Sequence, residues 1–174
     1  MPNILFLFTC LILSIGNPSD KMKEEQQENK GTTYYLIRHA EKDRTQAGNR
    51  DPELNTEGLK RAKKWAEVLK DVDFDAIYST NYKRTKQTAK PLAKLNELEV
   101  LEYDPRNLYN EYFKRATSGK TVLVVGHSNT TPHFANAILG EKKYEDIADN
   151  ENGALFIVHV QPDGSATCKV LYIN

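Results

Sequence analysis

The sequence predicts a three-layer α/β fold: a mostly parallel central sheet with helices on both faces and an antiparallel hairpin at its C-terminal edge. Strand-like segments alternate with segments whose apolar residues recur at helical spacing. The two strongest strand segments, 33–37 and 121–125, show no polar alternation, as expected of strands covered on both sides. The chain closes with two strand segments around a Pro-Asp-Gly turn, which is typical of a hairpin.

Local patterns place the individual elements. β-branched and aromatic runs predict strands at 33–37, 76–79, 99–103, 121–125, 154–160 and 167–173. Asn55 or Thr56 is the predicted cap of a first helix, whose apolar face is Leu59, Ala62, Ala66 and Leu69. Further helices are predicted at 107–116, from Pro132 to Leu139, and from about 82 to 96, the last with Ala89, Leu92, Ala93 and Leu95 as core residues.

At 174 residues the chain has the length of one domain, which we place at 33–174. Residues 1–16 are apolar and are predicted to be a signal peptide, and the polar segment 17–32 is predicted to be a flexible tether. We therefore expect a protein exported to the periplasm or cell envelope, with no membrane span after signal removal. Cys10 is a candidate lipidation site of a lipoprotein. If residues 1–16 are instead a buried element of the domain, a cytoplasmic location follows.

Composition disfavours two classes of function. The 24 basic and 24 acidic residues balance, whereas nucleic-acid-binding proteins usually carry a basic excess. The two cysteines, Cys10 and Cys168, lie far apart, and no Cys/His cluster has zinc-ligand spacing. We expect neither a nucleic-acid partner nor a metal site, and nothing in the sequence indicates the oligomeric state.

Charged side chains follow three of the predicted strands. Arg38-His39 ends the first strand, His127 ends the fourth, and Arg84 lies five residues after the second. The carboxyl ends of parallel strands meet at one edge of a sheet, so these four side chains should form a compact cationic pocket. Such a pocket suits phosphate. Because the surrounding positive charge should lower its pKa, His39 is interpreted as a nucleophile that attacks phosphorus.

Three stretches carry a family resemblance: Leu36 to Glu41 (LIRHAE), Ile77 to Ala89 (IYSTNYKRTKQTA) and Val124 to Ser128 (VVGHS). They resemble, in order and spacing, the conserved blocks of the histidine phosphatase, or phosphoglycerate-mutase-like, superfamily. Ala40 replaces the commoner glycine of the first block. The resemblance implies a phosphohistidine on His39, phosphoryl binding by Arg38, Arg84 and His127, and no cofactor. The short chain is most similar to small bacterial phosphohistidine or phosphomonoester phosphatases.

The remaining candidate site residues are a general acid and two substrate-binding side chains. Family members often use a carboxyl group as general acid, for which Glu111 or Asp104 is a candidate, and some small members lack one. Glu41 is expected to bind substrate or to orient a basic group, and Ser128 to bind substrate. The expected partner is a small phosphorylated substrate or a phosphoprotein. A mutase that returns the phosphoryl group to an organic acceptor, and a non-catalytic phosphate-binding or phosphoprotein-binding module, are the alternatives.

Overall fold

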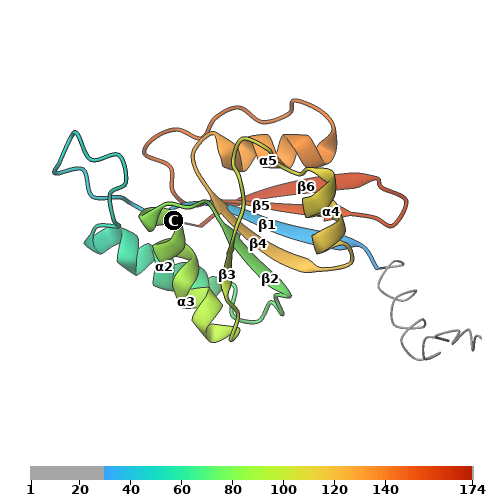
Figure 1. Cartoon of the computed structure of the whole chain (residues 1–174), viewed down its shortest axis with the longest axis horizontal. Coiled ribbons are helices and arrows are strands. Elements are labelled where there is room, and N and C mark those ends of the chain that lie inside the picture. Colours follow the sequence, from blue (N-terminus) through green and yellow to red (C-terminus); the bar gives the residue numbers. More distant parts are fainter. Residues whose placement is uncertain (1–29, 174) are drawn as a thin grey trace, which may run out of the picture.

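A six-stranded mixed sheet is the centre of the fold (Figure 1). The computed structural model describes residues 30–173, and within them the strands lie in the order β3-β2-β4-β1-β5-β6. The strands are β1 (Thr32–Arg38), β2 (Ala76–Ser79), β3 (Val100–Glu102), β4 (Thr121–Gly126), β5 (Ala154–Val160) and β6 (Ala166–Tyr172). The helices are α2 (Thr56–Val68), α3 (Lys83–Leu95), α4 (Glu111–Thr117) and α5 (Thr130–Leu139).

Strand direction determines where functional side chains meet. Strands β1, β2, β3 and β4 are parallel, and their register pairs Arg38 with Gly126 and Ser79 with Val125. Strands β5 and β6 are antiparallel, and β5 pairs with the other side of β1. The predicted mostly parallel sheet with a C-terminal antiparallel hairpin is confirmed. The carboxyl ends of β1, β2 and β4 therefore lie side by side.

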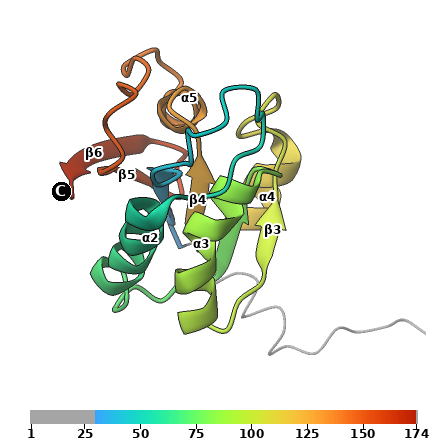
Figure 2. The same ribbon diagram turned by 90° about the vertical axis from the view of Figure 1, so that its left-hand side faces the viewer.

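Helices cover both faces of the sheet, as the sequence predicts (Figure 2). Helices α2 and α3 lie on one face, where Trp65 and Leu92 pack against Ile77 and other strand residues. Helices α4 and α5 lie on the other, where Phe113 and Phe134 pack around Tyr34. The two apolar layers hold the parallel strands between them, which gives the carboxyl edge a rigid base.

Side-chain caps set the helix starts. Asn55 caps α2 by accepting a hydrogen bond from the Gly58 amide, which confirms one of the two predicted caps. Helix α4 begins at Glu111, four residues later than predicted, because the Asn110 side chain accepts from the Phe113 amide and caps it there. Helix α5 begins at Thr130, two residues before the predicted start, with Asn129 as its cap.

Two predicted core residues are exposed. Leu59 keeps 48% of its surface and Leu95 keeps 54%, whereas Trp65 on α2 keeps 2%. Ala62, Trp65 and Leu69 are the buried apolar residues of the α2 segment, so its inward face is centred on the bulky indole. The predicted face of this helix is confirmed at Ala62, Ala66 and Leu69 and is wrong at Leu59.

Gly58 allows α2 to approach the chain that follows β1. A Cβ atom at this position would overlap the carbonyl oxygen of Glu41, which is itself fixed by a hydrogen bond from the Asn55 amide. Gly58→Ala should therefore destabilise the protein by about 2–4 kcal/mol, although alanine is intrinsically the better helix former. Urea unfolding measures this loss. Gly48→Ala is the matched control, since a Cβ there meets no atom within 4 Å, and its stability should stay within about 0.5 kcal/mol of the parent.

The predicted signal peptide at 1–16, with Cys10, and most of the tether at 17–32 lie outside the described residues. Thr32, placed at the end of the tether, is the first residue of β1. None of the helices between residues 30 and 173 has the length and apolar character to span a bilayer.

Candidate active site

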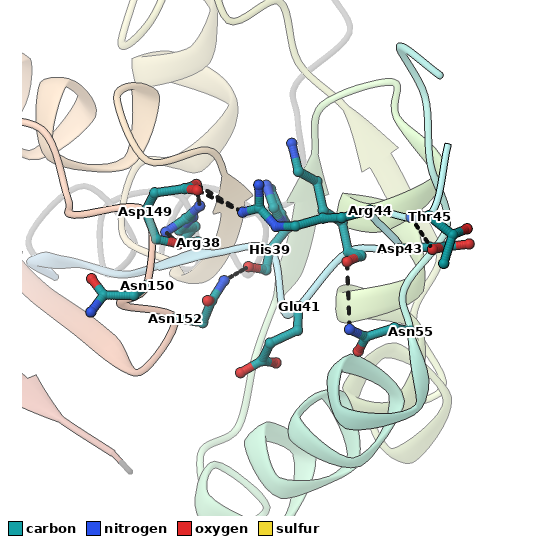
Figure 3. Close-up of a pocket in the computed structure, with 11 residues that line it drawn as sticks. Arg38, His39, Glu41, Asp43, Arg44, Thr45, Asn55, Asp149, Asn150 and Asn152 are labelled. Atoms are coloured by element: carbon teal, nitrogen blue, oxygen red, sulfur yellow. Dashed lines mark hydrogen bonds and ion pairs between the residues drawn. The ribbon is translucent and has the colours of Figure 1, made fainter. Parts of the chain in front are cut away.

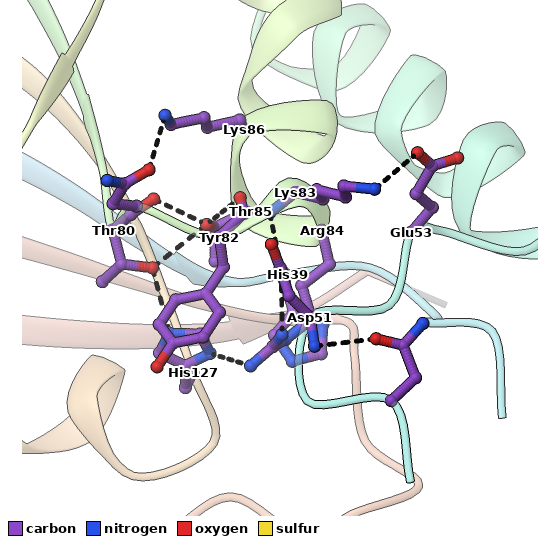
Figure 4. Close-up of polar contacts among 12 residues, drawn as sticks. His39, Asp51, Glu53, Thr80, Tyr82, Lys83, Arg84, Thr85, Lys86 and His127 are labelled. Carbon is purple, nitrogen blue, oxygen red and sulfur yellow. Dashed lines mark hydrogen bonds and ion pairs between the residues drawn. The ribbon is translucent and has the colours of Figure 1, made fainter. Parts of the chain in front are cut away.

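The four side chains predicted to converge do meet at the carboxyl edge of the sheet, and Figure 4 shows three of them, His39, Arg84 and His127. The His39 and His127 rings are 5.5 Å apart between centroids and nearly perpendicular. Arg84, in the first turn of α3, places Nη2 3.4 Å from Nδ1 of His127. Together with Arg38 they line a cavity of about 430 Å³. Two imidazoles and two guanidiniums thus surround a space large enough for a phosphoryl group.

Hydrogen bonds from two sides fix the backbone of His39, one to the end of β4 and one to the segment just before β5. Its amide donates to the Gly126 carbonyl at 2.9 Å, and its carbonyl accepts from Nδ2 of Asn152 at 2.9 Å. The side-chain Nδ1 lies 2.7 Å from the Ala40 carbonyl oxygen, which only accepts, so Nδ1 carries the proton. In the neutral ring Nε2 then has a free lone pair, which is the requirement for a nucleophile.

A chain of hydroxyl groups orients His127. Its Nδ1 faces the Arg84 guanidinium, which only donates, so Nε2 carries the proton and donates to Oγ1 of Thr80 at 2.9 Å. Thr80 in turn donates to Oγ1 of Thr85 at 3.0 Å, and Thr85 donates to backbone carbonyls. The two threonines therefore fix both the tautomer and the plane of the His127 ring.

Both histidines are neutral at pH 7. Burial lowers the pKa of His39 to about 3, with Arg84 and Arg38 adding to the effect and the hydrogen bond to Ala40 opposing it. Burial likewise lowers the pKa of His127 to about 4, and Arg84, Arg38 and Lys42 follow as causes. The sequence predicted a lowered pKa for His39 from nearby positive charge. The direction agrees, but burial is the larger cause.

Arg38 is buried and is clasped by the loop between α5 and β5 (Figure 3). Its Nη1 donates to the carbonyls of Ala148, Asp149 and Glu151 at 2.8–3.1 Å. Its Nη2 lies 3.0 Å from the carboxylate of Asp149, which also accepts from Arg44 at 2.8 Å. Nε of Arg38 is buried and has no hydrogen-bond partner among residues 30–173. The clasp thus fixes the guanidinium while leaving part of its donor capacity unused.

Arg84 is less tightly engaged than Arg38. Its nearest carboxylate is Asp51, with 3.7 Å between Nη1 and Oδ1, and its Cζ lies 4.4 Å from the centre of the Tyr82 ring. The Tyr82 ring also packs edge-on against His127, with 5.0 Å between centroids. Arg84 makes no short hydrogen bond to a carboxylate within the described residues, so its charge is available to a bound anion.

Of the other predicted site residues, Ser128 lies at the cavity, and Glu41, Glu111 and Asp104 lie outside its walls. Ser128 lines the 430 Å³ cavity, whereas Glu41 turns toward α2 and accepts from Nε of Arg61 at 2.7 Å. The structure does not bring Glu111 to this cavity: it lies exposed in the first turn of α4, paired with Lys114 at 2.7 Å. Asp104 lies nearer, in an adjoining pocket that also contains Tyr82, and is paired with Arg106.

Three residues of the site were not predicted from the sequence. Thr80 directly follows β2 at the edge where the histidines emerge, so its position was a usable signal. Lys42, three residues after His39, lines the cavity, and its nearness in sequence was a weaker signal. Asp149 lies in a loop without periodicity, and no local pattern indicates that it contacts Arg38.

Comparison with known proteins finds similarity to phosphatases. The family model of the histidine phosphatase superfamily (branch 1) matches residues 34–106. A protein of Schizosaccharomyces pombe named as a probable phosphatase is 27% identical over 177 aligned positions, covering 72% of this chain and 63% of that protein. Phosphoserine phosphatase 1 of Hydrogenobacter thermophilus is 40% identical over 73 positions, covering 40% of this chain and 35% of that protein.

The fold is also found among solved structures. The structure of the protein histidine phosphatase SixA complexed with tungstate superposes with a TM-score of 0.65 at 17% identity, covering 80% of this chain and 96% of that one. At that identity the likeness concerns the fold. The matched segment, residues 34–106, carries Arg38, His39 and Arg84 in the order and spacing described above, and this part of the chain is similar to branch 1 of the histidine phosphatase superfamily.

Proposed function

We propose that the protein is a metal-independent phosphatase that hydrolyses a phosphomonoester or phosphoramidate through a phosphohistidine on His39. Nε2 of His39 attacks phosphorus, a P–N bond forms, and the bond from phosphorus to the leaving oxygen or nitrogen breaks. Water then attacks the phosphohistidine, the P–N bond breaks, and inorganic phosphate and neutral His39 result. We also propose that the protein is exported to the periplasm or cell envelope.

The observation that carries the proposal is the pairing of one free imidazole nitrogen with two guanidiniums around a single cavity. At an effective dielectric constant near 20, one cation about 4 Å from one negative charge contributes about 4 kcal/mol before desolvation. Arg38 and Arg84 are held in place before substrate arrives, so little reorganisation opposes this stabilisation. SixA, with the same fold, binds tungstate, a tetrahedral oxyanion like phosphate. Neutral His127 lies beside His39, with 5.5 Å between the ring centroids.

The sequence left open which group protonates the leaving atom. Arg106 lowers the pKa of the Asp104 carboxyl, and Lys114 lowers that of Glu111, so both are ionised at neutral pH. Neither stores a proton for transfer in the free protein. In the proposed mechanism the leaving atom takes its proton from water. This favours leaving groups that depart as weak bases, such as a phenolate, or the neutral imidazole released from a phosphohistidine whose ring is already protonated.

Product analysis in ¹⁸O-labelled water tests the proposed reaction. The protein is incubated with phenyl phosphate and excess glycerate as an organic acceptor, and all phosphorylated products are identified. A phosphatase releases inorganic phosphate carrying one ¹⁸O atom. Phosphoglycerate as the main product would instead establish a mutase-type phosphotransferase, and tungstate binding without any turnover would establish a non-catalytic binding module.

A further inference from the structure

Lys42 lies in the walls of two neighbouring cavities, the 430 Å³ cavity at the two histidines and a larger one. The 430 Å³ cavity at the two histidines and a second cavity of about 880 Å³ share Arg38, His39, Lys42 and Asp149 in their walls. The larger cavity is otherwise lined by polar residues of the loop after β1 and of the loop before β5. A substrate whose phosphoryl group reaches His39 therefore has room for the rest of its structure beyond Lys42.

The ammonium group of Lys42 is not neutralised by the protein. Of the five arginines and lysines that line the two cavities, the four arginines have carboxylate partners, namely Asp149 for Arg38 and Arg44, Asp51 for Arg84, and Asp104 for Arg106. Within residues 30–173, Lys42 has neither an ion pair nor a hydrogen bond to its side chain. The carboxylate that acts most on it, Asp149, is already shared by two arginines.

The environment of Lys42 opposes its charge. Partial burial lowers the pKa of Lys42, and the nearby guanidiniums of Arg44 and Arg84 lower it further. Its backbone is nevertheless fixed, through a β-bridge to Leu54 and a 3.5 Å hydrogen bond from Asn55 to its carbonyl oxygen. A cation held in an unfavourable field at a cavity wall is stabilised when an anion binds there.

We propose that Lys42 recognises a second anionic group, a carboxylate or a further phosphoryl group, on the leaving group of the substrate, and that this group lies in the larger cavity. The inference rests on the proposed function and narrows its substrate class to phosphate esters whose leaving group is itself an anion. The transferring phosphoryl group stays with His39 and the two arginines. Lys42 then determines specificity and takes no part in breaking the ester bond.

A pair of nearly isosteric aryl esters tests this assignment. 4-Carboxyphenyl phosphate and 4-carbamoylphenyl phosphate have leaving groups of the same shape, of which only the first is charged. The parent protein should have the higher kcat/KM for the carboxylate. Lys42→Met should lower the carboxylate-to-amide ratio of kcat/KM about tenfold, the loss expected for one charge-assisted contact. Lys42→Arg should keep most of the ratio, and Lys42→Glu should invert the preference.

Two controls separate this inference from the proposed function. Lys60→Met removes an exposed lysine that pairs with Glu57 on α2, away from both cavities, and should leave the ratio unchanged. Calorimetric binding of the two esters to the His39→Ala protein reports the same preference without any turnover. A ratio that Lys42→Met leaves unaltered would refute the role of Lys42, while hydrolysis of the amide ester by the parent would still support a phosphatase. Absence of turnover with both esters contradicts the proposed function. In that case the role of Lys42 is tested by whether the protein binds the carboxylate ester more tightly than the amide ester and whether Lys42→Met removes this preference.

Discussion

His39→Asn should abolish the covalent intermediate and lower turnover by about 10³-fold or more, because the substituted side chain has no basic nitrogen to attack phosphorus. The geometry that supports this is the hydrogen bond from Nδ1 to the Ala40 carbonyl, which leaves Nε2 as the free base. Rapid quenching of the parent protein with a ³²P-labelled aryl ester should trap phosphate on the protein that is labile in acid and stable in alkali.

The matched control for this experiment is His133→Asn. His133 lies exposed on α5 and pairs with Asp146 at 3.1 Å, outside the walls of the catalytic cavity, so turnover and trapped label should match those of the parent. Label that persists at the parental level in His39→Asn, or that disappears in His133→Asn, would assign the nucleophile to another residue.

Arg84→Met should lower kcat by about 10²–10³-fold, with a smaller change in KM, since the guanidinium opposes charge that grows on the phosphoryl oxygens in the transition state. Arg84→Lys should recover only part of the loss, because an ammonium cannot donate two parallel hydrogen bonds to one phosphoryl group. Steady-state kinetics with an aryl phosphate measure both values. Arg115→Met, which removes an exposed arginine on α4, is the control and should retain parental kcat.

The same variant has a second readout in its pH dependence. Arg84 lowers the pKa of both His39 and His127, so its removal should raise these values from about 3 and about 4 toward that of free histidine. The imidazolium forms would then appear at higher pH, and the acid limb of the kcat/KM profile should move upward. An acid limb that stays in place in Arg84→Met would show that this guanidinium does not act on the histidines.

The part of the site that follows strands was predictable from the sequence. Arg38, His39 and His127 end buried parallel strands, and sheet topology alone brings such positions together. Arg84 was predictable because it opens the helix that follows β2. Glu111 could not be placed in this way, since the start of α4 depended on which asparagine capped it, and the cap at Asn110 leaves Glu111 beside Lys114.

The sequence did not predict which residues of a helix face the core or which loop residues contact the site. On α2, Leu59 and Trp65 each lie at helical spacing from the buried Ala62 or Leu69. Only packing against the sheet decides that Trp65 is buried and Leu59 is exposed. The contact between Arg38 and Asp149 joins residues more than a hundred positions apart through an irregular segment, which periodicity does not encode. The free Lys42 ammonium is likewise visible only once the carboxylates around it are known to be engaged elsewhere.

The carboxylate of Asp149, which two arginines share, should affect product release in the proposed reaction. A pocket whose guanidiniums were all unopposed would attract the departing dianion as strongly as the incoming one, and the enzyme would become saturated with its own product. By cancelling part of the charge of Arg38 and Arg44 while keeping Arg38 rigid, Asp149 weakens this retention without loosening the geometry. If the proposed phosphatase activity holds, the loop that carries Asp149 should thereby limit inhibition by accumulated product.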